Sequence, residues 1–198
     1  IYNRGNSKQK IFHDNEDYFR FISLLYACNS TNNFRVFILA KGESPYDFER
    51  GKQIVSIGTF CVMPNHFHIL ITQRGEGGIS KFMQKVSTAY SMYYNKKYNR
   101  TGGLFEGKFK SEYINKDQYL KYLFSYIHLN PIKLIQKDWK EVGIKNKKEA
   151  MDYLEKYKYS SYLDFLGTER IPNKILNIKI FPKYFPNKKS FIKEIFEW

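Results

Sequence analysis

Residues 54–72 read IVSIGTFCVMPNHFHILIT, and this stretch decides the fold that we predict for the chain. The apolar run ending at Met63 and the run over residues 66–72 each have the length and composition of a β-strand. Between them, Pro64 and Asn65 favour a tight turn, because proline fixes its φ angle and asparagine tolerates turn geometry. The stretch therefore predicts two strands joined by a tight turn.

His66 and His68 are the first candidate functional residues in this stretch. Residues i and i+2 of a strand project from the same face, so the two imidazoles would converge while Phe67 and Ile69 point to the core. Two histidines on a rigid strand are what a good metal site requires. A His-x-His pair taken alone is more often a surface or hydrogen-bonded pair, so this interpretation needs support from elsewhere in the chain.

The pattern before this stretch predicts a strand, a helix and a second strand. Asp14 is a suitable N-cap for the helix, and the spacing of Phe19, Ile22, Leu25 and Tyr26 indicates its buried face. In order, we expect a strand at residues 1–3, a basic turn at residues 4–8, the helix to about Asn29, a strand at residues 34–40 and a charged surface excursion over residues 41–53.

The pattern after this stretch predicts two helices with a strand between them. Phe82, Val86 and Tyr90 recur at helical spacing, and a Gly-rich segment at each end limits that helix. From Trp139 onward the chain is rich in lysine and aromatic residues, which suggests a helical appendage. We expect helices over residues 80–98 and 116–129 and a strand over residues 105–114, so the whole order predicts an α+β fold.

Composition and charge narrow the class of protein. The 198 residues are 42% hydrophobic, enough for one substantial core, and the formal net charge of +14 favours a polyanionic partner such as nucleic acid. A lysine-rich soluble protein would share this charge, so charge alone does not decide the partner. Cys28 and Cys61 lie in apolar surroundings typical of reduced, buried thiols, and no apolar run approaches a membrane span. A cytoplasmic protein without a membrane segment is expected.

The helix expected over residues 116–129 supplies the support that the histidines need. Tyr126 and Asn130 are four residues apart and share one helix face, which places a phenol beside an amide. With 17 tyrosines in the chain, a single tyrosine is more often a packing residue, and an asparagine before Pro131 is a natural helix terminator. His128 falls roughly on the opposite side of the helix, and we interpret it as structural.

Four motifs, CVMPNHFHILI, GGLFEGKFKS, YIHLNP and YSSYLDFLG, occur in an order and at spacings that resemble the REP-associated tyrosine transposases. These belong to the HUH superfamily of single-strand insertion-sequence transposases, and the resemblance runs from YNRGN to about Gly167. It implies a ferredoxin-like antiparallel sheet with helices, plus a helix bearing the nucleophile. Residues 1–138 would form the catalytic domain, and residues 139–198 a mainly helical appendage that is not an independent domain.

The resemblance also implies roles for individual residues. His66 and His68 match the metal-binding pair, Asn130 matches a third, amide ligand that is glutamine in shorter relatives, and Tyr126 matches the nucleophile. The implied reaction forms a 5′-phosphotyrosine and a free 3′-hydroxyl on single-stranded, hairpin-containing DNA, by a monomer rather than a homodimer. Magnesium prefers oxygen ligands and manganese accepts imidazole more readily, so Mg²⁺ and Mn²⁺ are both expected to serve.

Basic residues alternate with aromatic ones in three parts of the chain. Cations follow phosphates and aromatic rings stack on unpaired bases, which suits single strands and hairpin loops. Such lysines can equally form a solvated face. The candidate DNA-binding residues are Arg4, Lys8, Lys10, Lys96, Lys97, Arg100, Lys108 and Lys110.

Two other functions share these features. A ferredoxin-like nucleic-acid-binding module would use the same histidines and tyrosine only to contact bases and phosphates, without catalysis. A replication or repair nuclease would share the cleavage step and differ in its target. A zinc hydrolase is disfavoured, because no carboxylate next to His66 and His68 in the sequence completes a site.

Overall fold

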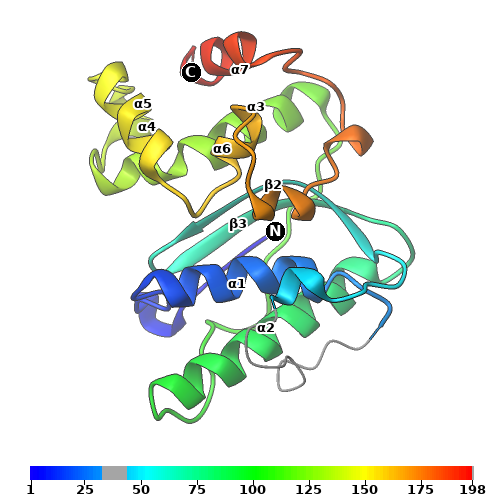
Figure 1. The fold of residues 1–198 in the computed structure, drawn as a ribbon. Helices are drawn as coiled ribbons and strands as arrows, with labels where there is room; N and C mark the ends of the chain where they lie inside the picture. The colour runs from blue at the N-terminus through cyan, green and yellow to red at the C-terminus, as the bar shows by residue number, and fades with distance from the viewer. Residues whose placement is uncertain (33–43, 198) are drawn as a thin grey trace.

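The structure, a computed structural model, describes residues 1–32 and 44–197. The strand expected at residues 34–40 lies outside the described residues. Within them the chain forms an antiparallel sheet with helices on both faces (Figure 1), which confirms the predicted α+β fold.

The sheet has three regular strands in the described residues, in the order β1-β3-β2. These are β1 (Tyr2–Arg4), β2 (Val55–Met63) and β3 (His66–Gln73), and both pairings are antiparallel. His68 stands opposite Tyr2 on one side and Cys61 on the other. β2 and β3 are thus the two strands expected from residues 54–72, with β3 at the centre of the sheet.

The prediction of a strand over residues 105–114 is wrong. Phe105 and Lys110 form isolated antiparallel bridges with Gly5 and Tyr2, and the residues between them do not continue the ladder. Gly107 has a φ of 112°, a conformation that interrupts extended pairing and that glycine adopts without strain. The segment therefore lies beside β1 as a broken edge rather than as a regular strand.

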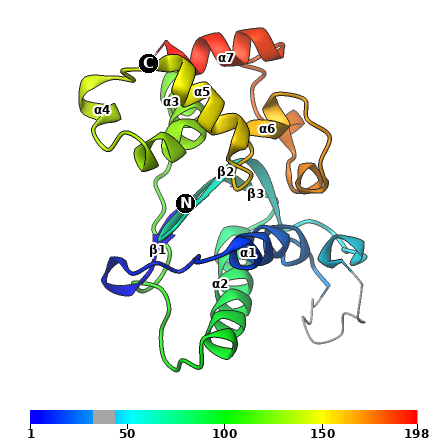
Figure 2. The same cartoon turned by 60° about the vertical axis from the view of Figure 1, so that its left-hand side comes forward.

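Helices α1 (Asn15–Ala27) and α2 (Gly78–Lys97) cover one face of the sheet (Figure 2). Asp14 caps α1 as expected, because its side chain accepts a hydrogen bond from the backbone N–H of Asp17. In the predicted buried face of α1, Ile22 and Leu25 are fully buried as expected and Tyr26 packs partly buried against the core. Phe19 was predicted wrongly: it is 43% exposed and contacts the ring of Tyr159 edge-on, and Phe21 is buried instead. Helix α2 buries Phe82, Met83, Val86, Tyr90 and Tyr94, in agreement with its predicted apolar side.

Helix α3 (Asp117–Leu129) covers the opposite face of the sheet and continues into the 3-10 helix η4 (Asn130–Leu134). Phe124 and Ile127 are buried against Cys61, Met63 and Leu70 of the strands. The helix expected over residues 116–129 is therefore present, and it packs on the same face of the sheet that carries the histidines.

Residues 139–197 form a C-terminal layer that packs around α3, and its last helix lies on the far side of α3 from the sheet (Figures 1 and 2). Its middle part lies along the sheet, where Ser160 and Leu176 form isolated bridges with Cys61 and Ile57 of β2. Leu129, Trp139, Leu154 and Phe191 belong to one buried cluster in this layer, so α3 packs between two apolar cores. The backbone N–H groups of Val62 and Ser161 bond the carbonyls of Tyr159 and Phe60, which ties the layer directly to β2. Its helices are α4 (Trp139–Val142), α5 (Lys147–Lys156), α6 (Tyr162–Phe165) and α7 (Lys188–Phe196).

Four further 3-10 helices connect these elements in the described residues: η1 (Asn6–Lys8), η3 (Pro45–Asp47), η5 (Ile171–Ile175) and η6 (Ile178–Ile180). Cys28 and Cys61 are buried free thiols, as expected. No helix in residues 1–32 and 44–197 has both the length and the apolar character that crossing a membrane requires.

Candidate active site

His66 and His68 lie on one face of β3, as the period of two residues predicts. Their ring centroids are 5.2 Å apart and the ring planes are nearly perpendicular. Phe67, between them, is fully buried in the core on the opposite face. Both imidazoles are half-buried, and α3 packs across this face of the sheet.

The electrostatic environment keeps both histidines neutral. Burial lowers the pKa of His66 to about 4 and the pKa of His68 to about 3, and for His68 the neighbouring His66 adds to the shift. His66 Nδ1 donates a hydrogen bond of 2.7 Å to Asn65 Oδ1, and the amide of Asn65 is itself held by the carbonyl of Lys8. The other ring nitrogen of His66, Nε2, therefore carries its lone pair, which is the form that binds a metal ion.

Tyr126 extends from α3 toward the histidines. Its ring centroid is 5.4 Å from that of His68, with the planes at 77°. The buried ring of Trp139 is also nearly parallel to the ring of Tyr126, with the centroids 6.5 Å apart. The phenol is thus held between β3 and the C-terminal layer, next to an imidazole.

Asn130 is the third candidate ligand and lies one helical turn beyond Tyr126. It is 3% exposed, and within the described residues its Oδ1 atom accepts no hydrogen bond. Its amide is close enough to His66 to favour the charged form of that imidazole, against the effect of burial on the pKa. An unpaired buried acceptor is costly, so this oxygen calls for a partner that a bound cation would supply.

These three side chains fit a divalent cation. Two neutral imidazoles and an amide oxygen are all ligands that Mn²⁺ accepts, and the oxygen also suits Mg²⁺. No group of three or more His, Cys, Asp or Glu side chains suited to a metal occurs in the part of the chain that the structure describes. Completing a three-ligand site here would therefore rest on the amide of Asn130.

A cavity of about 350 Å³ opens beside Tyr126 and His68. Tyr119 and Tyr122 line it from α3, with near-parallel rings whose centroids are 5.6 Å apart, and Tyr122 is in turn parallel to Tyr126 at 6.2 Å. An aromatic row of this kind offers surfaces on which unpaired bases stack. The cavity therefore places Tyr126 and His68 next to a row of stacked tyrosine rings.

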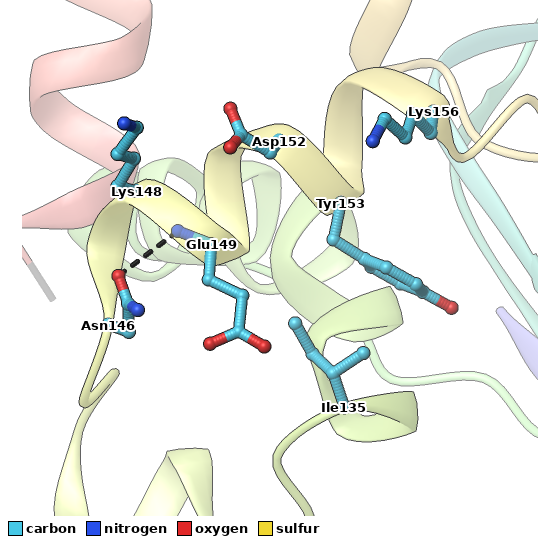
Figure 3. A pocket seen from close by; sticks show the side chains of 7 residues that line it. All are labelled: Ile135, Asn146, Lys148, Glu149, Asp152, Tyr153 and Lys156. Atoms are coloured by element: carbon cyan, nitrogen blue, oxygen red, sulfur yellow. Dashed lines mark hydrogen bonds between the residues drawn. The ribbon is translucent and has the colours of Figure 1, made fainter.

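A second cavity, of about 380 Å³, lies between η4 and α5 (Figure 3). Asn146 caps α5 there, because its side chain accepts a hydrogen bond of 3.1 Å from the backbone N–H of Glu149. None of the predicted site residues borders it, and its charges are mixed. Its lining residues are Ile135, Asn146, Lys148, Glu149, Asp152, Tyr153 and Lys156.

His128 occupies a different environment, in agreement with its structural interpretation. It is fully buried, and its Nε2 atom is hydrogen-bonded at 2.9 Å to the hydroxyls of both Thr59 and Ser161. The two hydroxyls are 2.6 Å from each other. Burial lowers the pKa of His128 to about 3. This trio joins β2, α3 and the C-terminal layer at one point.

The predicted DNA-binding residues divide into two groups. In the first group, Arg4 forms an ion pair with Glu106, and Lys8 and Lys110 lie near enough to lower the pKa of that carboxyl further. Lys10 and Lys108 are also exposed on the loops beside β1. Arg4, Lys8 and Lys110 gather along the broken edge of the sheet, where Arg4 stands opposite His66 in the register. The carbonyl of Lys10 instead accepts a hydrogen bond of 3.4 Å from the hydroxyl of Tyr94, near the end of α2.

The second group lies at the C-terminal end of α2, away from the histidines. Lys97 contacts the carboxylates of Asp14 at 2.8 Å, Asp17 at 2.9 Å and Glu16 at 3.1 Å, so it joins the end of α2 to the start of α1. Arg100 lies over the ring of Tyr94 at 5.6 Å, and Lys96 is exposed nearby. A role for these three residues in DNA binding stays a prediction.

Lys140 is a candidate that the sequence pattern did not indicate. Its Nζ atom lies 3.9 Å from the ring centroid of Tyr126, and the side chain lines the cavity of about 350 Å³. Lys140 follows the predicted catalytic region, in a lysine-rich segment where no local spacing distinguishes one lysine from another. The tertiary packing of its neighbour Trp139, whose ring is stacked on that of Tyr126, places Lys140 beside the site.

Comparison with known protein families found one match, over residues 49–130, to the family described as Transposase IS200 like. The matched segment holds both histidines of β3 and ends at Asn130, so it includes Tyr126. Neither the curated proteins nor the solved structures gave a match.

Proposed function

We propose that the chain, whose residues 49–130 match the IS200-like transposase family, is a REP-associated tyrosine transposase acting on single-stranded, hairpin-containing DNA. The observation that carries the proposal is the position of Tyr126, with its ring 5.4 Å from that of His68. A phenol beside two neutral imidazoles and an unpaired amide oxygen has the groups that phosphodiester transfer needs.

The proposed chemistry is a balanced exchange of one ester for another. The Oη atom of Tyr126 bonds to phosphorus and loses its proton, while the bond from phosphorus to the 3′-oxygen breaks and that oxygen takes up a proton. The products are a 5′-phosphotyrosine and a free 3′-hydroxyl. A second 3′-hydroxyl reverses the step and joins a new strand without ATP, because the ester bond is conserved.

His66, His68 and Asn130 would hold the divalent cation, either Mg²⁺ or Mn²⁺. When bound, the cation neutralises phosphate oxygens and favours the phenolate form of the nucleophile. Asn65 keeps His66 in the tautomer that leaves Nε2 available, through the hydrogen bond to Nδ1. The contacts of the Tyr126 ring with Trp139 and His68 restrict its orientation, which favours one direction of attack.

Substrate binding would use the basic edge formed by Arg4, Lys8 and Lys110, together with Lys10 and Lys108, where cations can follow the phosphates. Tyr119 and Tyr122 of the aromatic row would stack on unpaired bases. We further propose that the protein acts as a monomer in the cytoplasm.

The test uses the wild-type chain and Tyr126→Phe with labelled single-stranded hairpins taken from the flanks of its own gene, with Mn²⁺ or Mg²⁺ or with EDTA. A denaturant-resistant adduct is expected only with wild type and a divalent ion. The phenylalanine keeps the ring contacts, so its melting temperature should be unchanged. Hairpin binding without an adduct, across a broad hairpin library, would instead identify a binding module without catalysis.

A further inference from the structure

The family match does not explain the ammonium group that lies over the ring of the proposed nucleophile. Lys140 Nζ lies 3.9 Å from the ring centroid of Tyr126, whereas the matched segment ends ten residues earlier in the chain, at residue 130. The two residues come from different elements, α3 and α4. Their proximity is therefore a property of the tertiary packing of this chain.

The backbone that carries Lys140 is fixed from several sides. Trp139 is buried and stacks on Tyr126. Gln136 closes the loop around α4, because its Nε2 donates to the carbonyl of Gly143 at 2.8 Å and its Oε1 accepts from the backbone N–H of Lys145 at 3.0 Å. Lys145 also pairs with Asp138 at 2.8 Å. The amine of Lys140 is thus presented by a preorganised loop.

The charge of Lys140 is available to a substrate. Among the described residues, no carboxylate lies within ion-pair distance of its amine, whereas Arg4, Lys97, Lys121, Lys145 and Arg170 are all paired. Its contact is the face of a tyrosine ring at the wall of an open cavity. A phosphate attracts an ammonium more strongly than a ring face does, so an incoming phosphate would recruit this amine.

We propose that Lys140 is a further catalytic residue, whose ammonium contacts the phosphate that Tyr126 attacks. The inference rests on the proposed function, since it assigns a role within that reaction. The amine would neutralise charge that develops on the phosphate oxygens as the phosphorus–Oη bond forms and the bond to the 3′-oxygen breaks. The active site then extends beyond residue 138, and the C-terminal layer contributes chemistry as well as packing.

The experiment compares single-turnover adduct formation by wild type, Lys140→Ala, Lys140→Met and Lys140→Arg at saturating protein. Lys140→Met keeps the alkyl packing on the Tyr126 ring and removes only the charge. We expect the alanine and methionine variants to react on the order of 100-fold more slowly, as for loss of a donor to transition-state charge. Lys140→Arg should recover most of the rate. Lys137→Ala removes a lysine from the same exposed segment, away from the cavity, and should react like wild type.

Binding is measured separately, as hairpin affinity in a Tyr126→Phe background, together with the melting temperature of each variant. A specific role on the reacting phosphate predicts affinities within about threefold of one another, because one phosphate contact contributes little to the whole. If Lys140→Met reacts as fast as Lys137→Ala, or if its loss of rate matches a loss of affinity, the inference is wrong. A wild-type chain that forms no Tyr126-dependent adduct would instead overturn the proposed function, and this inference with it.

Discussion

The histidine pair on β3 and the single histidine on α3 have similar electrostatics and different surroundings. Burial lowers the pKa of His66 to about 4 and those of His68 and His128 to about 3. His68 borders an open cavity and a phenol, whereas His128 is enclosed by the hydroxyls of Thr59 and Ser161 and by aromatic rings. A low imidazole pKa therefore marks burial, and the neighbours of the imidazole mark its role.

The same division runs along helix α3. Tyr126 and Asn130 face the histidine pair, while Phe124 and His128 pack into the interior. One short helix thus carries the proposed nucleophile, Tyr126, on one side and the buried structural residue His128 on the other. Substitutions on the two sides should separate activity from stability, and the predictions below test that separation in order of decreasing effect.

The largest effect is expected for His68→Ala. Loss of one proposed ligand should slow adduct formation on the order of 1000-fold, about 4 kcal/mol of transition-state stabilisation. The free energy of unfolding should fall by less than about 1 kcal/mol, because the truncation enlarges an existing cavity rather than creating an enclosed one. Adduct formation and urea denaturation measure the two quantities. A large loss of stability without a loss of rate would mean that His68 has a structural role rather than a role in the reaction.

His128→Ala should give the opposite result. Removing a fully buried ring leaves a void and breaks hydrogen bonds to two buried hydroxyls, which costs about 2–4 kcal/mol of stability. The melting temperature should fall by roughly 5–12 °C. At a temperature where the variant is folded, adduct formation per folded molecule should stay near the wild-type rate; a rate as low as that of His68→Ala would place His128 in the active site.

Asn65→Ala probes the support of the histidine pair. The variant loses the acceptor that holds His66 Nδ1–H at 2.7 Å, so the imidazole can rotate or change tautomer. Loss of such a supporting partner typically lowers metal affinity about 10-fold or more. A titration of adduct formation with Mn²⁺ should therefore shift to higher concentration, and saturating Mn²⁺ should restore most of the rate. An unchanged titration would mean that Asn65 does not orient His66.

The smallest effect concerns the pH dependence of stability, and it should be the same for His68 and for His128. An unfolded histidine takes up a proton near pH 6.5, whereas His68 and His128 stay neutral in the folded chain until about pH 3. Stability is therefore complete above pH 6.5 and is lost as the pH falls below it. Each histidine should contribute about 1 kcal/mol of loss between pH 6.5 and 5.5. Urea denaturation at both pH values should show that His68→Ala and His128→Ala each reduce this pH-dependent loss of stability by the same amount.

Local patterns predicted the centre of the molecule well. The period of two in His66–Gln73 identified the histidine face, and the four-residue spacing of Tyr126 and Asn130 identified the face of α3 that meets it. Residues at the edge were harder to predict. Phe105 has the composition of a strand residue, but the left-handed Gly107 breaks the ladder. Phe19 is 43% exposed, and its ring contact is with Tyr159, a residue distant in the sequence.

Lys140 shows why part of the candidate site could not be predicted. Its position depends on Trp139 filling a core that α5 and α7 complete, and no periodicity in the sequence encodes that packing. The anchor of His128 likewise needs Ser161, a residue 33 positions away. Contacts between segments that are distant in the sequence depend on tertiary packing, whereas the buried face of a single helix or strand can be predicted from local spacing.

The short distance between Tyr126 and His68 has a kinetic consequence. Both side chains belong to one polypeptide, and α3 is packed between two cores, so the proposed nucleophile and the proposed ligands meet without a second copy of the chain. Cleavage as proposed is then first order in protein. Diluting the enzyme should lower the amount of adduct in simple proportion. Mixing an inactive variant with the active protein should neither raise nor lower the activity of the active protein.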